Sequence, residues 1–181
     1  MSDLLDSVEA QWSLGLMQRL AIGLGQSHTT TGRAMAGLIP TVMAALAHKS
    51  TDSQAMGAVY NMLKEGASNP ALKDLNALID AKKLGAGDAG NPAKELISSL
   101  FGNDAGRVQA LIQQFSGVKP NNTAPLLGLA GAMVMRGLGQ KVAAGMTQAN
   151  LAGQLAKERG SIAGAVPYEV ARLLEPAQAA A

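Results

Sequence analysis

Residues 124–139, APLLGLAGAMVMRGLG, consist of small and apolar residues, and Arg136 is the single charged residue among them. A helix that crosses a membrane needs about 20 consecutive apolar residues, whereas runs of about 10–14 are more often buried core helices. The uncharged run from Ala124 to Met135 is 12 residues long. This stretch therefore predicts a helix inside a helical protein and not a membrane anchor.

A second segment, residues 32–49 (GRAMAGLIPTVMAALAHK), has the same character, since 14 uncharged residues separate Arg33 from His48. Its apolar residues recur in pairs at 34/35, 38/39, 42/43 and 46/47, which is typical of a helix with a wide buried face. Small side chains in both segments allow two helix backbones to approach closely. We expect two long central helices, packed against each other and surrounded by shorter ones.

The remaining chain also favours an all-α fold, because only 3% of its residues are aromatic while 48% are hydrophobic. Such a core of small and straight-chain residues suits packed helices better than strands. Cap and stop residues predict one multihelical domain over residues 1–175, in which Gly66 ends a helix and Phe115 points inward. The predicted helices span about 3–25, 27–49, 52–66, 69–83, 91–102, 104–117, 120–140, 147–160 and 167–175, with a loop at 84–91 and a flexible tail at 176–181.

The two long segments also align with each other when the chain is shifted by 92 residues. No gap is needed, and the matches fall at equivalent points of a helix–turn–long helix–turn–helix unit. We interpret this as an internal duplication with units at about 13–66 and 105–160. The matched pairs are Gly25 with Gly117, Thr31 with Thr123, Val42-Met43 with Val134-Met135, Leu46 with Leu138, Lys49 with Lys141, and Leu63 with Leu155.

Charge and cysteine content exclude several classes of function. A formal charge of +2 is too small to indicate nucleic-acid binding. The absence of Cys excludes disulfides and thiolate chemistry. The N-terminal sequence MSDLLDSVEAQW carries acids in place of the basic region of a secretory signal, so we expect a cytoplasmic protein. The sequence does not indicate an oligomeric state.

No motif specifies catalysis, a cofactor or a metal. Residues 85–90, GAGDAG, match the dinucleotide fingerprint only by letter, because a predicted helix and not a strand precedes them. His28 and His48 lie about 30 Å apart at helical rise and cannot share a metal within one helix. Ser27 is better explained as a helix cap than as a nucleophile paired with His28. We therefore expect no catalytic, cofactor-binding or metal-binding residues and no enzyme activity.

Three segments resemble the YidB-like family of bacterial proteins of unknown function, and the resemblance covers roughly residues 4–170. It implies a bacterial source and a multihelical fold with an internal duplication, and it supplies no catalytic residues. In some relatives such a domain precedes a peptidoglycan-binding domain of the OmpA type, which implies an envelope-associated accessory domain as one alternative. The segments are LGQSHTTTGRAMAGLIPTVMAALA, FSGVKPNNTAPLLGLAGAMVMRGLG and LAGQLAKERGSIAGAVP.

The main functional hypothesis is a non-enzymatic helical module that binds an unidentified protein partner. No acidic residue occurs between Asp104 and Glu158, so this half of the chain offers a basic surface. Lys141, Lys157 and Arg159 are the predicted partner contacts, although cations at helix ends also complement the helix dipole. A carrier or sensor of a small apolar ligand is the alternative, since several of the nine Met residues could line a cavity.

Overall fold

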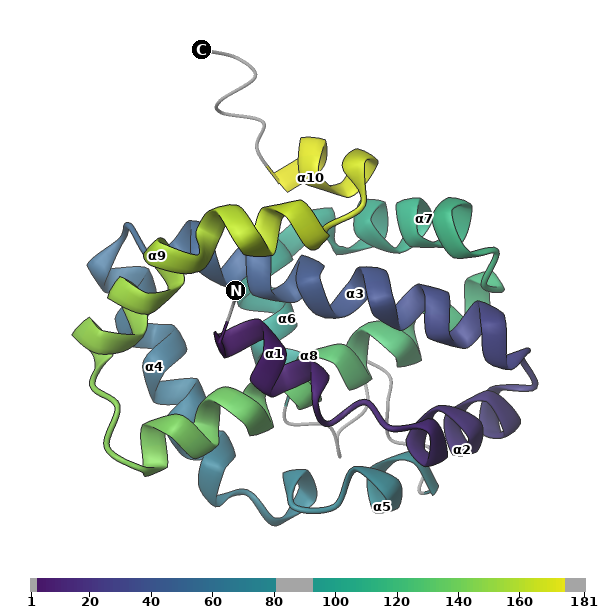
Figure 1. Cartoon of the computed structure of the whole chain (residues 1–181), viewed down its shortest axis with the longest axis horizontal. Coiled ribbons are helices and arrows are strands. Elements are labelled where there is room, and N and C mark those ends of the chain that lie inside the picture. The colour runs from purple at the N-terminus through teal and green to yellow at the C-terminus, as the bar shows by residue number, and fades with distance from the viewer. Residues whose placement is uncertain (1–2, 81–92, 175–181) are drawn as a thin grey trace.

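Helices make up the fold of residues 3–80 and 93–174, which the computed structural model describes, and no strand occurs there. The all-α prediction is therefore confirmed (Figure 1). In chain order the elements are α1 (Asp3–Glu9), α2 (Leu14–Leu24), α3 (His28–Lys49), α4 (Ser53–Ser68), the 3₁₀ turn η1 (Pro70–Leu72), α5 (Leu75–Asp80), α6 (Lys94–Phe101), the 3₁₀ turn η2 (Gly102–Asp104), α7 (Ala105–Ser116), α8 (Pro120–Ala143), α9 (Gln148–Ala165) and α10 (Tyr168–Leu174).

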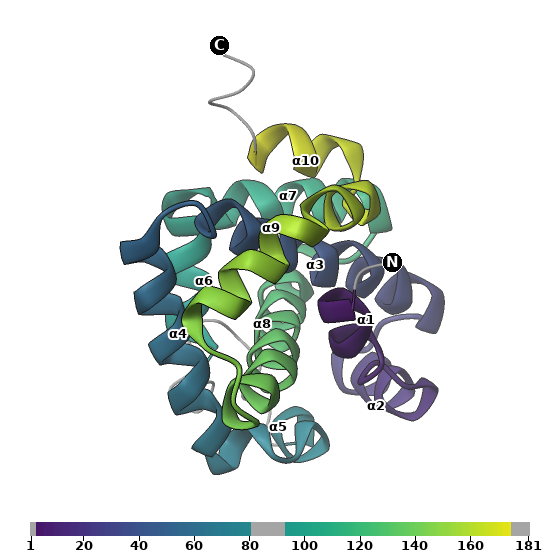
Figure 2. The same cartoon turned by 60° about the vertical axis from the view of Figure 1, so that its left-hand side comes forward.

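The two long helices α3 and α8 lie at the centre and contact each other, as predicted. Helices α1, α4, α6 and α7 pack against α8, and α9 covers α3 (Figures 1 and 2). Within the described residues, no helix combines the length and apolarity that crossing a membrane requires. Residues 124–139 thus belong to a buried central helix, α8.

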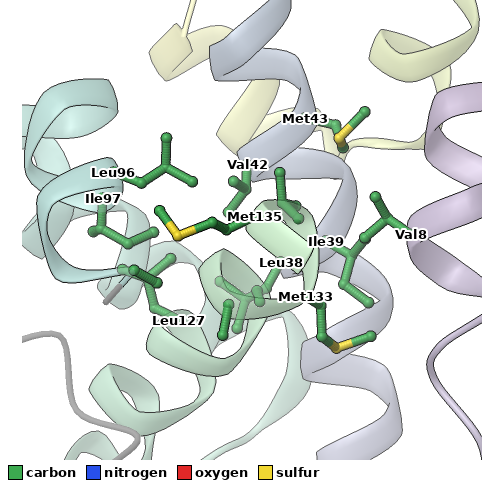
Figure 3. Packing of buried hydrophobic residues seen from close by; sticks show 14 of the residues in the cluster. Val8, Leu38, Ile39, Val42, Met43, Leu96, Ile97, Leu127, Met133 and Met135 are labelled. Carbon is green, nitrogen blue, oxygen red and sulfur yellow. The ribbon is translucent and has the colours of Figure 1, made fainter. Parts of the chain in front are cut away.

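Apolar side chains from the surrounding helices fill the space around α3 and α8. Met43 of α3 and Met135 of α8 are 0% and 2% exposed, and both lie in one continuous apolar cluster. Figure 3 shows part of this cluster, whose other labelled residues come from α1, α3, α6 and α8 and are Val8, Leu38, Ile39, Val42, Leu96, Ile97, Leu127 and Met133. Burial of both methionines between helices suits their flexible side chains, which adapt to irregular core packing.

Glycine residues bring α4 and α8 into close contact. A Cβ atom on Gly66 would lie 2.5 Å from Cγ of Met135, and one on Gly139 would lie 2.9 Å from the backbone oxygen of Leu63. The prediction that Gly66 ends its helix is wrong, because α4 continues to Ser68. The glycine at this position serves helix packing and not helix termination.

The single predicted helix 3–25 is also wrong, because the structure divides it into α1 and α2. The side chain of Ser13 accepts a hydrogen bond from the Leu16 N–H at 3.1 Å and starts a new helix. The side chain of Gln11 donates to the backbone oxygen of Met133 at 2.8 Å and ties the connection to α8. Local capping and one long-range hydrogen bond therefore override a continuous apolar stripe.

Other helix boundaries differ in detail from the predicted ones. Asn69-Pro70 begins the short turn η1, and a separate helix α5 follows after the side chain of Asp74 caps the N–H groups of Asn76 and Ala77. Helix α9 ends at Ala165 and not near residue 160. The predicted loop at 84–91, the Asn91-Pro92 start signal and the tail at 176–181 lie outside the described residues.

Helix boundaries follow the offset of 92 residues that suggested a duplication. Leu24 and Ser116 end α2 and α7, and His28 and Pro120 begin α3 and α8, so each pair is 92 residues apart. The order short helix, long helix, intermediate helix occurs in both halves. This agreement supports the repeat hypothesis, although common descent of the two units stays a prediction.

Candidate functional site

The three predicted partner-contact residues lie on two elements. Lys141 is half-buried in the last turn of α8, while Lys157 is exposed in the middle of α9. Arg159 is half-buried, and its Nη2 donates to Nδ1 of His48 at 3.0 Å. The guanidinium of Arg159 therefore helps to join α9 to the end of α3, and Lys157 is the most accessible cation of the three.

Lys157 and Arg159 do not share one surface of α9. Each helical residue is rotated by about 100° from the previous one, so these two side chains project about 200° apart. Glu158, between them, is 5% exposed and accepts the Leu4 N–H at 3.0 Å and Nε2 of Gln154 at 2.9 Å. Glu158, the first acidic residue after Asp104, thus anchors the N-terminal turn of α1, where a carboxylate is favourable.

An exposed aromatic surface at the junction of α7 and α10 was not predicted. Phe115 was predicted to point inward; its ring does contact Gly37 of α3, but the side chain is 43% exposed, and Tyr168 is 71% exposed. The guanidinium of Arg172 lies 5.9 Å from the ring centre of Tyr168. Phe115 occupies the last turn of α7, just before Gly117 reverses the chain with φ = 78°, so less of the core faces it. Figures 1 and 2 show α7 and α10 side by side.

A small cavity opens between the end of α4, η1 and α8. Its volume is about 120 Å³, below the several hundred Å³ typical of sites for larger ligands. Two cations and two amides are among its lining residues, so it does not favour the apolar-ligand alternative. The lining residues are Gly66, Ala67, Asn69, Leu72, Lys73, Arg136 and Gln140.

Within the part of the chain that the structure describes, no three His, Cys, Asp or Glu side chains are grouped as metal ligands would be. The fold and its surfaces define a class, namely an all-α domain built around two buried central helices. The chain belongs to the bacterial protein family of unknown function DUF937, whose family model matches residues 6–141. The comparison with curated proteins finds no significant match, and neither does the comparison with solved structures.

Proposed function

We propose that this chain is a non-enzymatic interaction module of the bacterial cytoplasm, and that it binds a protein partner through the aromatic surface of Phe115, Tyr168 and Arg172. Only five of the 181 residues are aromatic, and two of them are strongly exposed here. Phe, Tyr and Arg are the residue types that interfaces favour and that often dominate binding energy. The observation that carries the proposal is that two exposed aromatic side chains lie on the contacting helices α7 and α10.

The aromatic surface rests on a rigid support. Atoms of Phe115 and Pro167 lie 3.4 and 3.2 Å from the position that a Cβ atom of Gly37 would occupy, so both rings pack onto central helix α3. Arg172 faces the Tyr168 ring from one turn away on α10. A supported surface loses little side-chain entropy when a partner binds, which favours its use as a binding site.

We also propose that an acidic partner is steered by the three cations Lys141, Lys157 and Arg159. Exposed cations raise association rates more than they raise affinity, and added salt weakens their effect. Lys157 is the strongest candidate because it is exposed, whereas Arg159 is engaged with His48. The electrostatic contribution is therefore expected to come mainly from the two lysines.

The test compares two double variants of similar character in the bacterium that makes the protein. Phe115→Ala with Tyr168→Ala removes the aromatic surface, while Leu14→Ala with Ile22→Ala removes two other exposed large apolar side chains, which are 65% and 77% exposed. Quantitative mass spectrometry of co-purified proteins should show a specific partner lost by at least about tenfold with the first variant only, as expected for hot-spot residues. Equal recovery of every co-purified protein with wild type and both variants would refute the proposal.

Charge reversal tests the steering residues in the same assay. Lys141→Glu with Lys157→Glu should weaken partner recovery and reduce its salt dependence, because the exposed charge that attracts the partner is reversed. Adding Arg159→Glu to this double variant should lower its melting temperature, since this substitution breaks the contact between Arg159 and His48. If partner recovery and its salt dependence are unchanged in the lysine variant, Lys141 and Lys157 do not contribute to partner binding.

A further inference from the structure

We propose that the cavity between α4, η1 and α8 binds a small oxyanion, either a phosphate group or a carboxylate. This site is separate from the aromatic surface, since it is lined by other elements. Lys73 and Arg136 supply two positive charges, and Gln140 supplies an amide group. No acidic residue occurs among the lining residues that the structure describes. Such a set of donors matches the charge and the acceptor atoms of an oxyanion.

Arg136 is held in place while most of its donors stay available. Its Nη1 donates to Oε1 of Gln11 at 3.5 Å, and Gln11 is itself fixed by its bond to the Met133 backbone oxygen. A guanidinium carries five N–H donors, so one long hydrogen bond leaves most of them for another acceptor. Among residues 3–80 and 93–174, no carboxylate forms an ion pair with Arg136. A half-buried cation without a counter-charge is costly, and a bound anion would offset that cost.

Packing of α8 against α4 brings the lining residues of α8 to the cavity. Arg136 and Gln140 are four residues apart and therefore lie on the same face of α8. Gly139 lets this part of α8 approach α4, so both side chains reach the segment that follows Ala67. Lys73, directly after η1, is exposed and also forms no ion pair with any described carboxylate. Two cations from opposite sides thus meet at one opening.

Several carbonyl groups at the end of α4 and in η1 already accept hydrogen bonds from nearby groups of the protein. The backbone oxygens of Gly66, Asn69 and Pro70 accept N–H groups of the following turn at 3.1–3.2 Å, and the Glu65 oxygen accepts the Ser68 hydroxyl at 3.0 Å. The side chain of Asp74, the residue after Lys73, caps the start of α5. Lys73 and Arg136 lie near the C-terminal end of α4, where positive charge also complements the helix dipole, and neither forms an ion pair with a described carboxylate.

The size of the cavity sets the class of ligand. A volume of about 120 Å³ holds several water molecules at about 10–15 Å³ each. It suits a phosphate group or the carboxylate of a small organic acid, whereas the buried floor of Leu72 adds only a small apolar surface. A bidentate contact from Arg136 would orient either group.

Titration of the full chain with sodium phosphate and, separately, with sodium acetate tests the proposal. Ionic strength is held constant with sodium chloride, and binding is followed by amide chemical shifts and by melting temperature. We expect saturable shifts around Ala67, Lys73 and Arg136, and a rise in melting temperature beyond that in chloride alone. Tighter binding of phosphate assigns a phosphate ligand, and tighter binding of acetate assigns a carboxylate ligand.

Matched variants separate a specific site from general charge. Lys73→Gln with Arg136→Gln should weaken binding by at least about tenfold, whereas Lys64→Gln with Lys94→Gln removes the same charge outside the cavity and should leave binding unchanged. The single variant Lys73→Gln changes an exposed side chain and serves if the double variant does not fold. Absence of saturable binding to wild type, or equal affinity of wild type and the cavity variants, would overturn the proposal.

Discussion

Replacing Gly139 by Ala tests whether close helix contact holds the two halves of the fold together. The new methyl group would lie 2.9 Å from the Leu63 backbone oxygen and 3.3 Å from the nitrogen and Cβ of Ala67. The contacted atoms belong mostly to the backbone of α4, which cannot rotate away as a side chain can. Overpacking of this kind costs about 1–3 kcal/mol, while replacing Gly by Ala inside a helix gains about 1 kcal/mol.

Gly153→Ala on α9 is the matched control, because no atom lies within 4 Å of its added methyl group. Both substitutions carry the same propensity gain, so the difference between the two variants isolates the steric cost. That difference of about 1–3 kcal/mol corresponds to about 2–12 °C in melting temperature for a domain of this size. Thermal and urea unfolding followed by circular dichroism measure it. If Gly139→Ala stabilises the protein as much as Gly153→Ala does, the packing argument fails.

Two further predictions concern buried charge and pH. Met43→Asp or Met135→Asp should each unfold the domain or nearly so, because an unpaired buried charge costs several kcal/mol against a total stability of about 5–15 kcal/mol; an unchanged thermal melt would contradict this. Partial burial raises the pKa of the Glu9 carboxyl, and the nearby charge of Asp6 raises it further. The protonated form of Glu9 is therefore favoured in the folded state, so the contribution of Glu9 to stability is present at low pH and is lost as the pH rises through the raised pKa. Glu9→Gln should therefore reduce the loss of melting temperature over that range, and identical pH profiles would disprove it.

Periodic apolar residues predicted the fold class and the central helices because burial of a whole face leaves a repeated pattern. The break between α1 and α2 was missed because it depends on one serine cap and on a hydrogen bond from Gln11 to Met133. Gly66 was misjudged for a similar reason, since only the position of Met135 shows why a side chain is excluded there. Local sequence patterns thus do not predict a structure in which the role of one residue depends on contact with a distant residue.

Dependence on distant residues also explains why the sequence did not predict the exposure of Phe115 or the cavity. Phe115 fits the apolar stripe of α7, and only its place in the last turn exposes it. The cavity combines residues from three segments between Gly66 and Gln140, and no local motif contains them. One signal was available in the sequence, because Arg136 is the single charge in the apolar run 124–139. An isolated charge in such a run can indicate a binding site as well as a helix end.

The hydrogen bond between Leu4 and Glu158 has a consequence for synthesis. Its two residues are 154 positions apart, so a ribosome adding about 5–20 residues per second needs about 8–30 s to supply the second partner. During that interval α1 has emerged without its anchor, and α3 lacks the cover that α8 and α9 provide. The apolar face of α3 is then open to other nascent chains. This domain is therefore expected to complete folding only after most of it has been translated, and to depend on chaperones until then.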